Sequence, residues 1–302
     1  MSKGVVLTDH RKGLAIAGIG GVLLAIDIPL IRLAETDPWT TLTIRGPIMF
    51  LTLFTVYMVL KRMKLTVAKF YEGNDTLILA IMHAIATVGF VVAIYHTTTA
   101  NLVFITAFSS LIAIVFSTIV LGERHPLMTW GTILVALMGI VIITVDDFIT
   151  TQGRNTFGNM MALMCATMLA GEVIFIRRSG KNLVFAPALA GVIAAAFSLP
   201  LAIGYGMSLD RPEFLIINSI LVSPIAMAFM SLAPRFIPAP EAAMFYLLET
   251  VLAPIFVWVI FLERPTTNTL IGGLIIISAI GFHSYIRVRN CLLYTSPSPR
   301  DS

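Results

Sequence analysis

The sequence is dominated by apolar segments of about 20 residues, each followed by a short polar connection. A helix of about 20 apolar residues crosses the ~30 Å hydrocarbon core of a bilayer. Because lipid offers no hydrogen bonds to the backbone, segments of this length cross it as helices. We predict an all-α polytopic membrane protein with ten transmembrane helices, at roughly residues 13–34, 38–60, 77–97, 101–120, 127–146, 157–176, 185–206, 214–233, 240–262 and 267–286.

Composition excludes several other classes of protein. Hydrophobic residues make up 58% of the 302 residues and charged residues 12%, whereas soluble domains carry about 25% charged residues. Basic residues form no stripe interleaved with aromatic residues, so we expect no nucleic-acid partner. The two cysteines, Cys165 and Cys291, lack partners at the spacing of a disulfide framework or a metal site. We therefore expect neither a metal nor a cofactor.

Lysine and arginine residues indicate the orientation. Short cytoplasmic loops of membrane proteins carry an excess of these residues. If the N-terminus is cytoplasmic, every lysine falls on the cytoplasmic side. The arginines on the opposite side are then Arg32, Arg154, Arg211 and Arg264. Since ten helices return the chain to the side where it began, we predict that both termini are cytoplasmic.

The sequence also repeats itself. At an offset of 145 residues, a glycine, an acid and an arginine recur at the same spacing, in the pairs Gly13/Gly158, Asp27/Glu172 and Arg32/Arg177. At an offset of 140 residues, Leu121-Gly-Glu-Arg124 matches Phe261-Leu-Glu-Arg264. Each half then holds five spans, and an odd number requires the second half to insert upside down. Inverted repeats of this kind place a substrate site near the bilayer midplane, between the halves.

Five plus five spans, with Leu-Gly-Glu and a glycine-spaced helix closing each half, resemble the drug/metabolite transporter superfamily, whose repeat is called EamA. Within it the chain looks most similar to the bacterial aromatic amino acid exporters, also associated with methyl viologen export. The resemblance implies a basket of ten helices around a central cavity. It also implies a secondary carrier in the bacterial inner (plasma) membrane.

The repeats suggest a division of the chain into four parts. We predict a cytoplasmic N-terminus over 1–12, a first EamA repeat over 13–146 and a second over 157–286. The segment 291–302 is polar and rich in Ser and Pro. We predict that it is a non-native or disordered tail.

Glu249 is the first candidate for a functional residue, because it lies inside the apolar run 240–262. A carboxylate at that depth is costly unless it is paired, protonated or facing water. It would bind a substrate ammonium group or exchange a proton, or else it is a protonated acid bonded to a backbone carbonyl. Tyr246 shares its helical face. The residue at the matching position of the first half is Ser109, followed by Ser110.

Asp27 and Arg45 form the second candidate. By helical rise, both lie about 10 Å from the same membrane surface, on neighbouring helices. An ion pair between them would satisfy both charges. Two interpretations remain open, an outer gate that opens and closes or a static buried pair that fixes packing.

Glu172 and His83 complete the candidate set. Glu172 is the repeat mate of Asp27, but the position that matches Arg45 is Ala190. Either Arg177 or Arg178 reaches back to Glu172, or Glu172 faces the cavity on the cytoplasmic side. His83, in span 3, would titrate near neutral pH in a proton pathway, or it is neutral and hydrogen-bonded across helices.

The sequence thus predicts a transporter that exports aromatic amino acids, and aromatic or cationic compounds, by alternating access. A carrier of the same superfamily for another metabolite or a drug is the alternative. An intramembrane enzyme is disfavoured, since the paired acids Asp146 and Asp147 end span 5 at the surface and no protease signature occurs. We expect a small-molecule substrate, contact with the lipid bilayer and a monomeric chain. Glu263, at a helix junction, is predicted to cap the next helix.

Overall fold

The computed structural model describes residues 3–64, 69–124, 126–181, 183–232 and 246–294, and within these ranges all regular structure is helical. The first repeat contains α1 (Lys3–Leu33), α2 (Pro38–Arg62), α3 (Asn74–His96), α4 (Thr99–Ala107), α5 (Ser109–Leu121) and α6 (Leu127–Thr151). The remaining elements are α7 (Thr156–Ser179), α8 (Ala186–Tyr205), α9 (Pro212–Ile217), the π-helical η1 (Asn218–Val222), α10 (Ser223–Leu232), α12 (Tyr246–Phe261) and α13 (Thr267–Tyr294).

Seven helices in the described ranges are long and apolar enough to cross a membrane. Three shorter apolar helices follow, over Pro212–Met227, Leu248–Phe261 and Thr267–Ala279. The predicted eighth and ninth spans lie partly outside the described residues. The chain is therefore a multi-pass membrane protein, and the count of ten spans stays a prediction.

Two of the predicted spans are not continuous α-helices. The span predicted at 101–120 is broken at Phe108 into α4 and α5. The span predicted at 214–233 contains the π-helical turn η1, in which the Ser223 amide donates to the carbonyl of Asn218. Pro224 follows this turn, and a proline has no amide to donate to the carbonyl four residues before it. The missing bond favours a wider turn at this point.

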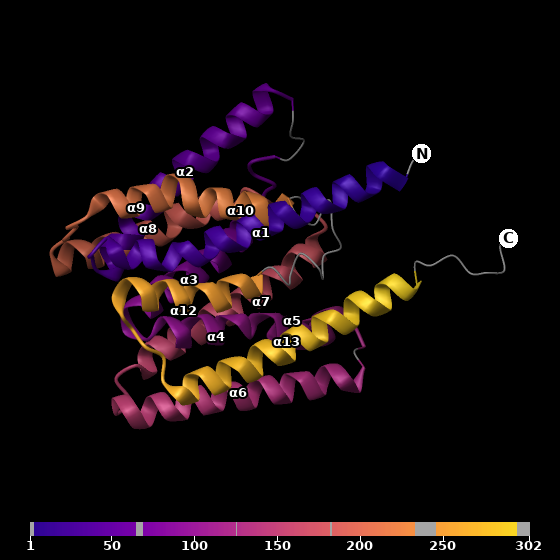
Figure 1. The fold of residues 1–302 in the computed structure, drawn as a ribbon. Helices are drawn as coiled ribbons and strands as arrows, with labels where there is room; N and C mark the ends of the chain where they lie inside the picture. The colour runs from indigo at the N-terminus through magenta and orange to yellow at the C-terminus, as the bar shows by residue number, and fades with distance from the viewer. Residues whose placement is uncertain (1–2, 65–68, 125, 182, 233–245, 295–302) are drawn as a thin grey trace, which may run out of the picture.

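The long helices run side by side in a bundle, with α6 and α13 together at its edge (Figure 1). Inside it, α1 lies between α10 and α12, and α7 packs against α3, α4 and α5. The first turns of α1 and the last turns of α13 lie at the same end (Figure 1). We call the opposite end, where α1 ends at Leu33 and α2 begins at Pro38, the α1–α2 end.

Small residues allow the closest helix contacts. α2 and α8 cross at Gly46 and Gly191, where a Cβ on Gly46 would lie 2.1 Å from the Gly191 carbonyl oxygen. Such contact is typical of membrane helices, because small residues let the backbones approach. Large apolar side chains such as Leu134 and Val259 are instead exposed on the outside of the bundle. Lipid would cover them in a membrane.

Polar contacts join the two halves of the chain at both ends of the bundle. At the α1–α2 end, the Thr36 hydroxyl donates to the Ser208 carbonyl at 2.7 Å. At the other end, Lys181 pairs with Asp75 at 2.5 Å. The hydrogen bond to Asp75 raises the pKa of the Lys181 amine above its ordinary value.

Candidate functional site

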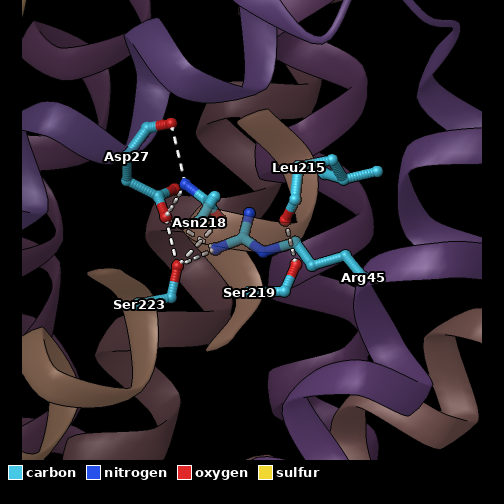
Figure 2. A network of polar contacts seen from close by, with 6 residues as sticks. All are labelled: Asp27, Arg45, Leu215, Asn218, Ser219 and Ser223. Atoms are coloured by element: carbon cyan, nitrogen blue, oxygen red, sulfur yellow. Dashed lines mark hydrogen bonds and ion pairs between the residues drawn. The ribbon is translucent and has the colours of Figure 1, made fainter. Parts of the chain in front are cut away.

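A buried polar network surrounds Asp27, six residues before the end of α1 (Figure 2). The Arg45 Nη2 on α2 donates to Asp27 Oδ1 at 2.8 Å. Asn218 Nδ2 donates to the same oxygen at 3.0 Å and to the Asp27 backbone carbonyl at 3.2 Å. The Ser223 hydroxyl donates to Asp27 Oδ1 and accepts from Arg45 Nη2 at 2.8 Å. The structure thus brings Asp27 and Arg45 together, with two further partners.

The network lies almost entirely out of solvent. Asp27 is 6% exposed, Arg45 is 7% exposed and Asn218 is fully buried. A carboxylate and a guanidinium in such a place are tolerated when they are paired and when their remaining hydrogen-bonding atoms are satisfied. Here one atom is left over, because Arg45 Nε has no hydrogen-bond partner among the described residues.

The π-helical turn makes the network possible. Asn218 and Ser223 are five residues apart, which in an α-helix places them about 140° apart around the axis. In η1 the i to i+5 bond brings both side chains to the face that meets α1. Ser219 in the same turn bonds back to the Leu215 carbonyl at 2.7 Å and takes no part (Figure 2).

Sequence reasoning missed Asn218 and Ser223. The available signal was the run Asn218-Ser219 and Ser223-Pro224 inside an otherwise apolar segment. Polar residues within a span face the bundle interior, and a proline there marks an irregular turn. Regular α-helical spacing would place the two side chains on different faces of the helix. Only the structure shows that both reach Asp27.

Glu172 and His83 form a second, partly buried pair, between α7 and α3. His83 Nδ1 lies 3.1 Å from Glu172 Oε2. The other carboxylate oxygen, Oε1, is buried and has no hydrogen-bond partner among the described residues. Arg178 is exposed, and the side chain of Arg177 lies outside the part of the chain that the structure describes. The structure places His83 against Glu172, a partner that the sequence analysis did not propose for it.

Glu249 lies in the first turn of α12 and is partly buried. α12 packs against α1 and α4. The Glu249 carboxyl is within electrostatic range of Asp27 and of Cys165 on α7. Within the described part of the chain, no hydrogen bond holds it. It therefore lies within electrostatic range of the Asp27 network without belonging to it.

The other predicted residues near Glu249 are only partly placed. Ser109 begins α5, directly after the break at Phe108, and is partly buried. The side chains of Ser110 and Tyr246 lie outside the described residues, so the predicted grouping of Tyr246 with Glu249 stays a prediction.

A third polar cluster lies at the α1–α2 end. Arg32 pairs with Glu263, and its Nη1 also donates to the Thr99 hydroxyl at 3.1 Å. Glu263 Oε1 accepts from the Thr99 amide at 3.2 Å. Glu263 therefore binds the first turn of α4, not that of the helix that follows it. A pocket beside the cluster is lined by residues that include Asn101, Asp146 and Thr269.

Comparisons with known proteins agree with this architecture. The sequence profile of the EamA-like transporter family matches residues 11–145 and again residues 156–285. No curated protein sequence matches the chain. Sixteen chains of solved structures match this fold. One of them, a crystal structure, superposes on this chain with a TM-score of 0.60. The match covers 90% of this chain and 98% of the other at 16% identity, so it shows the fold alone.

Proposed function

The chain belongs to the EamA-like transporter family, and from this membership we propose that it is a secondary carrier that works by alternating access. Its two EamA repeats would move against each other around a site between them. In transporters built from repeats, the substrate site lies at the repeat interface near the midplane.

One observation carries the proposal. The two polar networks inside the bundle both join one matched segment to the other. Asp27 of the first segment is held by Asn218 and Ser223 of the second, and Glu172 of the second meets His83 of the first. Ionisable groups inside membrane helices are costly and mark the paths of substrates and ions. Their position at the boundary between the repeats supports a transport site there.

The packing of helices supports inverted repeats. α3 of the first repeat packs against α7, the first helix of the second repeat. In the same way, α10 of the second repeat packs against α1, the first helix of the first repeat. This exchange of partners is what a two-fold axis between the repeats would produce, and an odd number of spans in each repeat would place that axis in the membrane plane. We propose ten spans in two inverted groups of five.

The distribution of basic residues supports an orientation with both termini in the cytoplasm of a bacterium, and therefore a chain in the inner membrane. In this orientation the α1–α2 end faces outward. The contact between Arg32 and Glu263 closes that end across the repeats. We propose that the chain acts as a monomer.

For the substrate we propose aromatic amino acids, exported from the cell. A substrate of this kind needs an apolar pocket for its ring and a few polar groups for its zwitterion. The buried acids among apolar helices supply such groups. A carrier for another metabolite or a drug would use the same architecture, and the substrate panel below separates the two. Membership in a family of transporters favours both over an enzyme.

The test is transport by the purified full chain in liposomes. Radiolabelled phenylalanine, tyrosine, leucine and threonine are supplied separately, under imposed pH and voltage gradients, with empty liposomes as the control. We expect saturable movement of the aromatic pair. We also expect Glu249→Gln to slow it and Glu213→Gln, on the exposed start of α9, to leave it unchanged. Movement of leucine or threonine alone would favour the alternative substrate. If no solute moves faster than in empty liposomes, the carrier proposal is wrong.

A further inference from the structure

Glu172 and Asp27 occupy corresponding places in the two repeats. They match at the 145-residue offset of the sequence repeat, and Asp27 lies near the end of α1 whereas Glu172 lies in the second half of α7. Each acid bonds a residue from the third span of the opposite repeat, which is Ser223 for Asp27 and His83 for Glu172. These two partners are 140 residues apart, the offset at which Leu121-Gly-Glu-Arg124 repeats. The two networks are therefore copies of one arrangement.

The copies differ in the partners of the acid. Asp27 has a cation, Arg45, whose guanidinium bonds to Oδ1. The residue that corresponds to Arg45 is Ala190, which is fully buried. Ala190 packs in the same apolar cluster as Ala84, the neighbour of His83 in α3. At Glu172, the repeat thus keeps the acid and loses the arginine.

The loss leaves a specific atom without a partner. Glu172 Oε2 meets His83, whereas Oε1 is buried and has no hydrogen-bond donor among the described residues. A carboxylate accepts about four hydrogen bonds, and a buried oxygen without a donor costs free energy. A donor that carries a positive charge compensates such an oxygen best.

The described surroundings of Glu172 supply no fixed cation that would take the place of Arg45. Cys165 lies on α7, seven residues before Glu172, and is within electrostatic range of both Glu172 and Glu249. Arg45 is already engaged by Asp27 and Ser223. Arg178 is exposed. The described residues therefore leave Glu172 Oε1 without a compensating positive charge.

We propose that Glu172 is the binding site for a primary ammonium group of the transported solute, which takes at Oε1 the role that Arg45 has at Asp27. The proposal rests on the proposed function and names the part of the substrate that the chain recognises. The preferred class is a cation or a zwitterion that carries an ammonium group. An organic anion without such a group is excluded.

Three compounds with the same ring test this proposal. 2-Phenylethylamine carries the ammonium group alone, phenylalanine carries both charges, and 3-phenylpropionate carries the carboxylate alone. Equilibrium binding of each is measured on the full chain in lipid nanodiscs. We expect the two ammonium compounds to bind and 3-phenylpropionate to show no binding. Glu172→Gln, which keeps a side-chain oxygen for His83, should weaken binding of 2-phenylethylamine at least tenfold. Glu213→Gln, exposed on α9, should not change it.

A second measurement uses the unmodified protein, in case Glu172→Gln fails to fold. A carbodiimide that labels buried carboxyl groups is applied with and without each compound, and labelled residues are located by mass spectrometry. We expect 2-phenylethylamine to protect Glu172 and 3-phenylpropionate to leave its labelling unchanged.

The proposal is overturned if Glu172→Gln binds 2-phenylethylamine as well as the unmodified chain does, which is the result expected of a Glu172 that is protonated throughout. It is also overturned if 3-phenylpropionate binds best, or if neither ammonium compound binds or protects. Binding at equilibrium needs no transport. A chain that moves solutes in liposomes but fails these tests retains the proposed function and loses this site.

Discussion

Asn218 and Ser223 both donate hydrogen bonds to Oδ1 of Asp27, although five residues separate them along one helical segment. The π-helical turn between them brings the two side chains to one face. π-helical turns inside α-helices occur frequently at functional sites. Here the turn lets one span hold the acid of another from two positions. The network around Asp27 thus depends on backbone geometry as well as on residue type.

Replacing either donor is expected to destabilise the fold. Hydrogen bonds to a buried charged group contribute about 1.5–3 kcal/mol, and both donors are buried. Asn218→Ala and Ser223→Ala should each lower the free energy of unfolding by that amount, measured by denaturant titration in detergent micelles. Asn268→Ala removes a 2.8 Å bond to Asp146 at an exposed site, and it should cost less than about 0.5 kcal/mol. Equal losses for the buried and exposed variants would contradict the role given to the network.

The pair of Asp27 and Arg45 should behave as a coupled unit. Arg45→Met leaves a buried carboxylate without its cation, a change that costs about 3–5 kcal/mol. The double variant Asp27→Leu with Arg45→Met removes both charges and should recover most of that loss. Strictly additive effects in this double-mutant cycle would mean that the two side chains are not coupled.

The same double variant distinguishes a gate from a static pair. A gate must form and break the pair during the cycle, so a stable double variant should fold normally and transport at least tenfold more slowly. If the pair only fixes packing, the folded double variant should transport at a normal rate in the liposome assay.

The contact between Arg32 and Glu263 is expected to limit access to the pocket at the α1–α2 end. Thr269 lines that pocket and is buried. In a chain with Cys165→Ala and Cys291→Ser, we introduce Thr269→Cys and measure its labelling rate by a charged thiol reagent in nanodiscs. Adding Glu263→Gln should raise that rate several-fold, because the link to Arg32 and to the Thr99 amide is weakened.

Glu35→Gln is the matched control for this experiment. Glu35 pairs with Arg211 at 3.3 Å at the same end of the bundle, but both side chains are about half exposed. Exposed ion pairs contribute little, so the labelling rate should stay unchanged. An equal rise for Glu35→Gln would show a general loosening of that end.

The crossing of α2 and α8 should tolerate no side chain at Gly46. A methyl group there would lie 2.1 Å from the Gly191 carbonyl oxygen, so the helices must separate. Gly46→Ala is expected to lower the unfolding free energy by about 1–3 kcal/mol, as overpacking does. Gly131→Ala meets no atom within 4 Å and should be neutral or stabilising by up to about 1 kcal/mol. Thermal unfolding in micelles compares the two variants directly.

Part of the candidate site could be predicted from the sequence, because the relevant signals are local or repeated. Asp27 and Arg45 lie at similar depths on consecutive helices joined by a short connection, so their contact could be expected. The assignment of Glu172 and Asp27 as mates came from the offset of 145 residues. The contact between His83 and Glu172 could not be expected, because it joins helices far apart in the chain.

The sequence by itself determined the class of the molecule. Runs of about 20 apolar residues can only be helices in lipid, since the backbone must satisfy its own hydrogen bonds. The order of residues also revealed the internal duplication and the few acidic residues that lie inside the spans. Tertiary structure decided the partners. The crossing of distant helices decides which donors reach Asp27. It also decides that one oxygen of Glu172 meets His83 and that the other meets no donor among the described residues. Local periodicity carries no information about those crossings, and the wider turn at Asn218 changes even the face that periodicity assigns.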